Sequence, residues 1–243
     1  VLITGETMSQ NFPTLNPGGG AFFQDSIGHG SNGGVCEVDC DAIILKFNNT
    51  GVLLWSTFYG GLTDDVGASI CTDLFGNVFV TGGSRSPSWS FDSKLDPGGG
   101  AYFQGFRSGG IDAFILKFNN AGVRLWATFF GGQGGEVGRS ITTDASGNLF
   151  LFGGTYSVDL PVKDPGGGSF FKGTLSATTF SVAATGMTFV VADDVFIAKF
   201  SNTGVLLWST YYGGNFWEGG GWLDNMETDA CGNLYLSFET WTD

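Results

Sequence analysis

The residues of this sequence that could bind a ligand most readily are carboxylates at equivalent turns of a repeated segment. Asp64 and Asp65 stand in the turn GGLTDDVG, where the other copies carry Gly135-Glu136 and Glu218. Carboxylate oxygens are the ligands that a hard cation such as calcium prefers. Asp64 and Asp65 are therefore candidates for a metal site or a sugar-binding rim. Charged side chains in a solvated turn explain the same residues and are the preferred interpretation.

A second set of carboxylates opens three Asp-x-x-Gly-Asn segments, at Asp73, Asp144 and Asp229. Calcium would suit these oxygens as well. An aspartate that caps a turn with its side chain, followed by a glycine in the left-handed conformation, explains the spacing without any ligand. We therefore expect turns here and no cofactor, with calcium as the open alternative.

Little in the sequence favours an enzyme. The single histidine, His29, lies in a glycine-rich loop, and no catalytic triad can be assembled around it. No Gly-Lys-Ser/Thr follows the Gly-Gly-Gly runs, so these runs are not phosphate loops. A glycosidase would need only two carboxylates, but nothing marks a particular pair among the 23 acidic residues. We predict a non-enzymatic protein without catalytic residues.

The tryptophans fall into two groups. Three recur inside the repeated apolar runs and are expected to pack in the core: Trp55, Trp126 and Trp208. The others lie in variable segments, where exposed aromatic side chains often stack on sugar rings. The best candidates for a glycan-binding site are Phe216, Trp217 and Trp222. Local packing of these side chains is the preferred alternative.

Two cysteines lie close together in the segment CEVDC. Cys36 and Cys40 lack the two further ligands that a zinc site would require nearby. They could form a small-loop disulfide, which would suit an oxidising exterior, or remain two buried free thiols.

The charge of the chain narrows the choice of partners. With 10 Lys and Arg against 23 Asp and Glu, the formal charge is −13. Such a surface repels the phosphate backbone of nucleic acids and anionic membranes. No apolar run reaches the roughly 20 residues of a membrane-spanning helix. We expect a protein or a glycan as the partner, with no nucleic acid and no membrane insertion.

The elements that must position these residues are strands. The segment Asp112–Gly132, DAFILKFNNAGVRLWATFFGG, has close copies at Asp41–Gly61 and Asp194–Gly214. Each copy consists of two apolar runs joined by a polar turn that ends in glycine. This pattern predicts a β-hairpin.

The hairpins belong to a longer repeat. We divide the chain into repeats 1–77, 78–148 and 149–233 with a partial repeat 234–243, and both ends look truncated. One repeat contains four expected strands: 114–118, 123–130, 138–143 and 148–153. Three of them are apolar at nearly every position, so both of their faces should be covered.

Four antiparallel strands that are buried on both faces and repeated along the chain are typical of propeller blades. A β-sandwich would instead show alternating polar residues, and a solenoid would have shorter units. We predict an all-β, β-propeller-like array of four-stranded antiparallel blades, with about three repeats that form part of a larger propeller. Closed propellers use about 4–8 blades, so further blades would come from the same parent chain or from another copy.

The repeat resembles a known family. DAFILKFNNAGVRLWATFFGG, followed by Asp144-Ala-Ser-Gly-Asn148 and LFLF, closely resembles the bacterial SBBP β-propeller repeat, and Pro17–Gln24 is similar to the PGAFQ element of that family. The resemblance covers nearly the whole chain. It implies a secreted or cell-surface bacterial protein, commonly large and multidomain, and it defines no catalytic residues. This chain departs from the pattern in its long loops 84–110 and 155–192, and the second loop is expected to form an extra hairpin or an exposed interaction strand.

The functional prediction is a non-enzymatic extracellular module with a structural, adhesive or ligand-binding role in a bacterial surface protein. A carbohydrate-binding or carbohydrate-active domain is the first alternative. A structural unit of a fibre or repeat array is the second.

Overall fold

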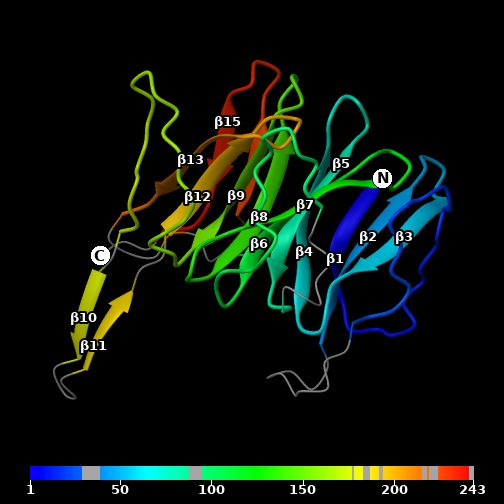
Figure 1. The fold of residues 1–243 in the computed structure, drawn as a ribbon, viewed down its shortest axis with the longest axis horizontal. Coiled ribbons are helices and arrows are strands. Elements are labelled where there is room, and N and C mark those ends of the chain that lie inside the picture. The colour runs from blue at the N-terminus through cyan, green and yellow to red at the C-terminus, as the bar shows by residue number, and fades with distance from the viewer. Residues whose placement is uncertain are drawn as a thin grey trace.

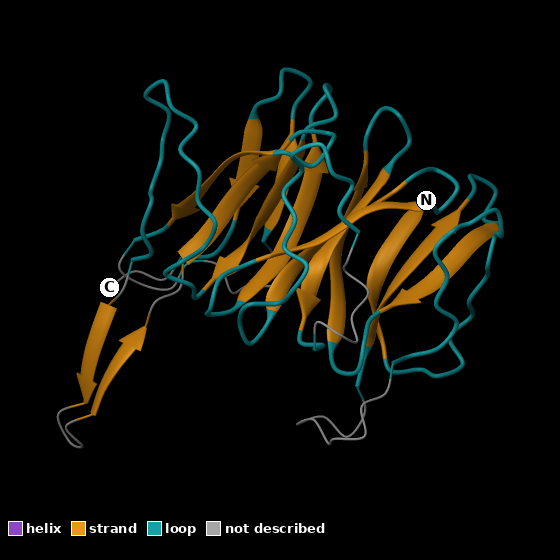
Figure 2. Ribbon diagram, in the orientation of Figure 1, coloured by secondary structure: helices purple, strands orange, loops and turns teal. Residues whose placement is uncertain are grey.

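The computed structural model describes residues 1–28, 39–87, 95–176, 178–182, 187–191, 194–214, 218 and 224–240. Within this part of the chain the regular structure consists of strands, and no helix is present (Figure 2). Two four-stranded antiparallel sheets form the centre of the molecule. Blade 2 contains β4 (Asp65–Thr72), β5 (Val78–Ser84), β6 (Asp112–Phe118) and β7 (Arg124–Phe130), paired in that order. Blade 3 contains β8 (Glu136–Thr143), β9 (Leu149–Thr155), β12 (Asp194–Phe200) and β13 (Leu206–Tyr212).

Smaller sheets flank these two blades. Blade 1 consists of β1 (Leu2–Thr7), β2 (Asp41–Phe47) and β3 (Leu53–Tyr59), and the two-stranded blade 4 consists of β14 (Asn225–Thr228) and β15 (Leu234–Ser237). The sheets stand side by side in chain order, from β1–β3 at one end to β13 and β15 at the other (Figure 1). Their first strands contact one another, since β8 touches both β4 and β14. The all-β propeller architecture predicted from the sequence is confirmed.

The blades are offset by two strands from the four-strand unit expected at 114–153. The four strands expected within one repeat are found close to their expected positions, at β6, β7, β8 and β9. They divide between two sheets: β6 and β7 lie in blade 2, whereas β8 and β9 lie in blade 3, where β9 pairs with β12 of the next hairpin. Each full sheet is therefore built from two consecutive repeats.

The hairpin turns follow from local chemistry. Asn119 Oδ1 accepts hydrogen bonds from the backbone N–H groups of Ala121 and Val123, at 2.9 and 3.0 Å. Gly122 closes the turn with φ of 83°, a conformation that costs other residues about 1–2 kcal/mol. The same turn recurs between β2 and β3 and between β12 and β13, with Gly51 and Gly204 at φ of 84° and 85°.

Aromatic layers between the blades form the core. All seven residues of β6 and all seven of β9 are buried, which confirms the expectation that both faces of these strands are covered. The sheets approach each other too closely for a side chain at some positions. A β-carbon on Gly138 of β8, in blade 3, would lie 2.1 Å from Thr81 Oγ1 of β5, in blade 2.

The outer edges of the blades are covered by the long loops that contain Pro-Gly-Gly-Gly. Leu15 forms a bridge with Ser56 on β3, with N···O distances of 3.0 and 3.1 Å. Leu95 and Lys163 form the same bridge to β7 and β13. These loops satisfy edge groups that would otherwise be free to pair with another strand.

The apolar insert in the loop after β9 forms an additional hairpin, as predicted. Its strands are β10 (Thr178–Val182) and β11 (Met187–Val191), which pair antiparallel. They form a separate two-stranded sheet that extends away from the blades (Figure 1).

Candidate functional site

A pair of buried carboxyl groups lies at each contact between consecutive blades. We call these contacts junction 1 (blades 1 and 2), junction 2 (blades 2 and 3) and junction 3 (blades 3 and 4). The pairs are Asp41 with Asp65, Asp112 with Glu136, and Asp194 with Glu218. All of these residues are buried, and five of the six have no exposed surface. The first residue of each pair begins an inner strand of one blade. The second lies where the chain enters the next blade.

The Gly-Gly step that ends each hairpin holds the second carboxyl group. The N–H of Gly61 donates to Asp65 Oδ2 at 2.7 Å, and that of Gly132 donates to Glu136 Oε2 at 2.8 Å. A β-carbon on Gly131 would lie only 2.4 Å from Glu136 Oε2. Glycine is needed at this position because a side chain would overlap the carboxyl group.

The first carboxyl group is held by the residue that follows the aromatic pair of each Pro-Gly-Gly-Gly loop. The donors are Gln24 Nε2 to Asp41 Oδ2 at 2.8 Å, Gln104 Nε2 to Asp112 Oδ2 at 2.9 Å, and Lys172 Nζ to Asp194 Oδ2 at 2.7 Å. Lys172 therefore places a positive charge where the other two junctions have a neutral amide. Backbone N–H groups of the same loops add further hydrogen bonds, such as Gly28 N to Asp41 Oδ2 at 3.0 Å.

Burial makes these carboxyl groups hard to ionise. It raises the pKa of Asp41 to about 7 and that of Asp65 to about 6. Burial also raises the pKa of Asp112, Glu136 and Glu218. The partner carboxylate adds to the effect on Asp41 and Glu136, because two negative charges repel each other in a poorly solvated site.

A lysine joins blade 1 to the hairpin turn of blade 2, and another joins blade 2 to that of blade 3. Lys117 is buried, and its Nζ donates to the carbonyl O and the Oδ1 of Asn202, at 2.6 and 2.7 Å. Asn202 Nδ2 in turn donates to Asp73 Oδ2 at 2.8 Å. Lys46 makes the equivalent contacts with Asn120 at junction 1. These contacts fix the register of one blade against the next.

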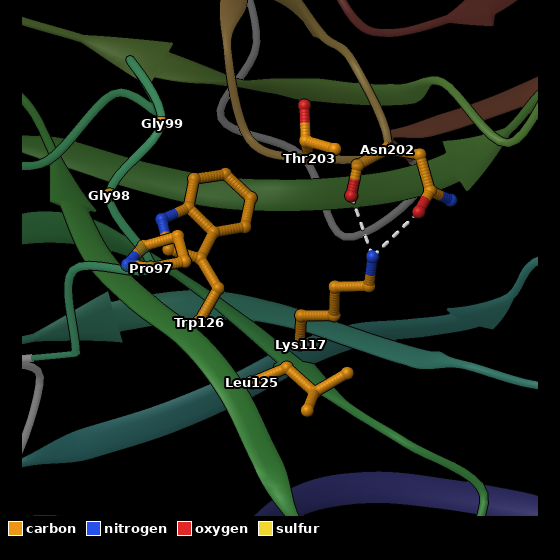
Figure 3. A pocket seen from close by; sticks show the side chains of 8 residues that line it. All are labelled: Pro97, Gly98, Gly99, Lys117, Leu125, Trp126, Asn202 and Thr203. Carbon is orange, nitrogen blue, oxygen red and sulfur yellow. Dashed lines mark hydrogen bonds between the residues drawn. The ribbon is translucent and has the colours of Figure 1, made fainter.

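A pocket of about 350 Å3 opens beside the Lys117–Asn202 contact of junction 2, which we call the lysine lock (Figure 3). It is lined by Trp126, Lys117, the blade 3 turn and the Pro97-Gly98-Gly99 loop. Its polar groups are already engaged, because Trp126 Nε1 donates to Tyr102 O at 3.2 Å and Lys117 donates to Asn202. The pocket is therefore part of the blade interface and offers no obvious reactive group.

An aromatic wedge from each long loop fills the space between blades. The N–H of Phe22 donates to Gly122 O at 3.0 Å, and its ring centroid lies 5.2 Å from that of Tyr59. Tyr102 repeats this arrangement one blade later, with its N–H 2.8 Å from Gly204 O. The Pro-Gly-Gly-Gly-aromatic element is thus a connector between blades.

The metal candidates from the sequence are separated by the structure. Asp65 is fully buried and belongs to the junction 1 pair, whereas Asp64 is partly exposed and lies 3.7 Å from Cys40 Sγ. The solvated-turn interpretation is therefore wrong for Asp65, because its carboxyl group points into the blade contact. Within the described residues, no three or more His, Cys, Asp and Glu side chains gather as a metal cluster would require.

Several other candidates lie outside the described residues: Cys36, Phe216, Trp217 and Trp222. The disulfide of Cys36 with Cys40 and the glycan-binding site therefore stay predictions. Cys40 itself is buried, and burial raises its thiol pKa to about 12. Across the described part of the chain, no helix is long and apolar enough to cross a membrane.

The Asp-x-x-Gly-Asn segments are turns, as predicted. Asp73 Oδ1 accepts hydrogen bonds from the N–H groups of Phe75 and Asn77, both at 2.9 Å. Asp144 and Asp229 make the same contacts. A turn cap accounts for these carboxylates without a metal ion.

Sequence reasoning missed the aspartates that begin each hairpin copy, Asp41, Asp112 and Asp194. Each begins a copy of the repeated hairpin segment and is a charged residue directly before an apolar strand. Their presence in all three copies was the signal that could have identified them.

Comparison with known proteins agrees with this architecture. No family model matches the chain. Over 183 residues the chain is 25% identical to an uncharacterised WD repeat-containing protein of Acanthamoeba polyphaga mimivirus. The match covers 71% of this chain and 12% of that protein. Structure and match agree on a β-propeller repeat. The finer assignment to bacterial SBBP repeats is not tested by this match.

Proposed function

We propose that this chain is a non-enzymatic scaffold that binds protein through the outward face of blade 3. The observation that carries the proposal is a change in exposure at equivalent aromatic positions. Tyr59 and Phe130 are 1% and 0% exposed, whereas Tyr212 is 44% exposed. The wedge residue Phe170, whose ring centroid lies 5.3 Å from that of Tyr212, is 62% exposed.

The neighbouring strand β15 shows the same change. Tyr235 is 59% exposed, whereas Phe79 and Phe150 occupy the equivalent positions of β5 and β9 at 1% and 3%. Tyr235 lies on the far side of blade 4, because Leu234 and Leu236 on either side of it pack against blade 3. Phe170 and Tyr212 form what we call the open face. Exposed aromatic side chains of this kind are enriched at the centres of protein interfaces.

The other blades indicate the chemistry of the occupant. Phe22 and Tyr102 are covered by the next hairpin, whose turn supplies a carbonyl group to the wedge N–H and an asparagine to the lysine. We therefore propose an apolar β-hairpin with an Asn-x-Gly turn as the segment that docks on the open face. A further repeat of the same parent chain or of another copy would provide one. The match to a WD repeat-containing protein supports the propeller repeat on which this proposal is built.

The buried acidic pairs also favour a scaffold over a glycosidase. A glycosidase presents two carboxyl groups to its substrate in a cleft. Asp41, Asp65, Asp112 and Glu136 have no exposed surface, so a sugar cannot reach them. Their position between blades suits a structural role.

The test uses a synthetic peptide with the sequence of residues 112–132 as the probe. We expect saturable binding to the chain by fluorescence anisotropy, and about tenfold weaker binding to a Tyr212→Ser variant because the open face loses its central ring. Leu54→Ser, at an exposed position of β3 outside the open face, is the matched control. Equal binding of a scrambled peptide, or unchanged binding to Tyr212→Ser, would contradict the proposal.

The proposed location is extracellular, at the surface of a bacterium, with an adhesive role. This part rests on the resemblance of the repeats to those of secreted proteins. Surface biotinylation of intact cells that produce the parent protein tests it, and labelling only after lysis would count against it.

A further inference from the structure

One edge of blade 1 is open within the described residues. In blades 2 and 3 the second strand, β5 or β9, lies between the first strand and the third, whereas β1, the equivalent strand of blade 1, pairs only with β2. All residues of β5 and β9 are buried, but every residue of β1 is at least partly exposed. Ile3 is 43% exposed, whereas Val80 and Leu151 at the equivalent positions are fully buried. The difference marks the place that β4 and β8 fill in the other two blades.

A glycine of β1 leaves room for a strand at this edge. In blade 2, a β-carbon on Gly82 of β5 would lie 1.7 Å from the carbonyl O of Val66 on the first strand. In blade 3, a β-carbon on Gly153 of β9 would lie 2.1 Å from the carbonyl O of Val137. Gly5 occupies the same position of β1, but a β-carbon there would meet no atom within 4 Å. Blade 1 therefore has the glycine that close approach of a first strand requires, without that strand.

Hydroxyl groups at the end of the second strand hold the acidic residue that opens the first strand. In blade 2 the first strand begins with Asp65, and Ser86 Oγ donates to its Oδ2 at 2.7 Å. In blade 3 the first strand begins with Glu136, and Thr155 Oγ1 donates to its Oε1 at 2.6 Å. Both donors belong to a Ser/Thr-x-Ser segment that ends β5 or β9. This segment therefore recognises a carboxylate on the neighbouring strand.

The same Ser/Thr-x-Ser segment ends β1 and is formed by Thr7 and Ser9. The N–H of Ser9 donates to Thr7 Oγ1 at 3.1 Å, as that of Ser86 donates to Ser84 Oγ at 3.2 Å. Ser86 is buried, whereas Ser9 is exposed. Among the described residues no carboxylate accepts a hydrogen bond from Thr7 or Ser9, and Ser9 Oγ instead donates to a nearby asparagine at 3.0 Å. The hydroxyl pair of blade 1 is thus arranged as in blade 2 but holds no acidic residue.

We propose that the free edge of β1 is a binding site for an extended peptide segment of a partner protein, headed by an acidic residue. The segment pairs antiparallel with β1, as β4 pairs with β5. Its backbone passes over Gly5, and its carboxylate accepts hydrogen bonds from the hydroxyl groups of Thr7 and Ser9.

The segment also needs an aliphatic residue after the acidic one. In blade 2, Ile70 of the first strand lies opposite Val80, and in blade 3, Ile141 lies opposite Leu151. An aliphatic side chain at the equivalent position of the bound segment covers Ile3, since directly opposite residues share one face of a sheet. Main-chain hydrogen bonds supply affinity at such an edge, and the two side chains supply specificity.

The probe is a fluorescent peptide with the sequence of residues 134–143, which contains β8. We expect saturable binding to the chain by fluorescence anisotropy, and slower hydrogen exchange of the β1 amides in the complex. Gly5→Ala should fold with an unchanged unfolding midpoint, because its β-carbon meets open space. It should bind the peptide at least about tenfold more weakly, because the methyl group takes the place of the peptide backbone. Leu54→Ser, on β3 at the opposite edge of blade 1, is the matched control.

A second variant tests the carboxylate contact. Ser9→Ala removes an exposed hydroxyl group and should weaken binding of the peptide about tenfold, because a hydrogen bond to a charged group is lost. It should not change binding of the Glu136→Ala peptide, which carries no carboxylate at that position. Equal losses for the two peptides would overturn the proposed contact.

Three further results bear on the site as a whole. No saturable binding at millimolar peptide would overturn the proposal, as would unchanged binding to Gly5→Ala. Slow exchange of the β1 amides before peptide is added would also overturn it, because another segment or a second copy would then already cover the edge. Tyr212→Ser should leave binding of this peptide unchanged, so that this site and the open face can fail independently.

Discussion

Junction 2 and the open face of blade 3 are built from equivalent residues, but only junction 2 is covered. Phe130 is buried beneath the β12–β13 hairpin, whereas Tyr212 at the same position is largely accessible. Lys117 reaches the turn of the next blade, whereas Lys199 instead pairs with Asp144 at 3.2 Å. The difference shows which interactions depend on a neighbouring hairpin and which belong to a single blade.

The largest effect should come from truncating the covered ring. Phe130→Ala leaves a cavity at junction 2 and is expected to lower the free energy of unfolding by about 3–5 kcal/mol. Tyr212→Ala at the open face should cost about 1–2 kcal/mol, because 44% of Tyr212 is already exposed and less of it is packed. Urea denaturation of both variants measures the contrast. Equal losses would mean that the open face is covered in solution.

The lysine lock provides the second contrast. Lys117→Met leaves two oxygens of Asn202 without their donor, so we expect a loss of about 1–3 kcal/mol in the free energy of unfolding. Lys199→Met removes one partly exposed ion pair and should cost less than about 1 kcal/mol. The same denaturation experiment compares them. A larger loss for Lys199→Met would show that the lock at junction 2 contributes little.

The hairpin turns allow a finer comparison. Gly122 and Gly51 share the same left-handed conformation, so alanine at either should cost about 1–2 kcal/mol in backbone strain. A β-carbon on Gly122 would also contact Ala21 at 3.4 Å, whereas one on Gly51 meets no atom within 4 Å. Gly122→Ala should therefore be the more destabilising of the two, by calorimetric unfolding. A larger destabilisation by Gly51→Ala would mean that the turn around Gly122 can shift to accommodate the β-carbon.

The smallest effect is a change in pH dependence at junction 2. Burial raises the pKa of Glu136 above its ordinary value of 4.5, so the folded state binds more protons than the unfolded state. Its contribution to stability is complete below pH 4.5 and is lost as the pH rises through the higher folded-state pKa. Glu136→Gln should flatten this fall, as measured by unfolding between pH 4 and 8 with chelator present. Parallel curves for parent and variant would argue against a buried acid at this position.

The sequence predicted the hairpins and the blades because their signals are local. The turn Asn119-Asn120-Ala121-Gly122 and the apolar runs on both sides specify a hairpin without reference to the rest of the chain. The offset between repeat and blade could not be obtained in this way, since strand pairing between β9 and β12 joins residues of two separate hairpins. Only the three-dimensional arrangement shows that consecutive repeats share a sheet.

The acidic pairs could be predicted only in part, because one member is marked by its local sequence and the other is not. Asp65 was selected as a candidate from its turn, but its partner Asp41 lies at the start of a different strand. Spacing along the chain gave no indication that the two carboxyl groups meet across a blade contact. The role of Lys172 was equally hidden, because a lysine in place of a glutamine looks like an ordinary change of surface charge.

The bases of the three long loops are almost identical, although the loops differ in length and sequence. Thr7 pairs with Asp41, Ser84 with Asp112 and Thr155 with Asp194, so each loop leaves and rejoins its sheet at adjacent positions. Closing a loop between fixed neighbours costs only about 0.6 kcal/mol more for each doubling of its length. The loop after β9 is therefore a natural place to graft a foreign peptide, such as an epitope or a protease site, without disturbing the blades.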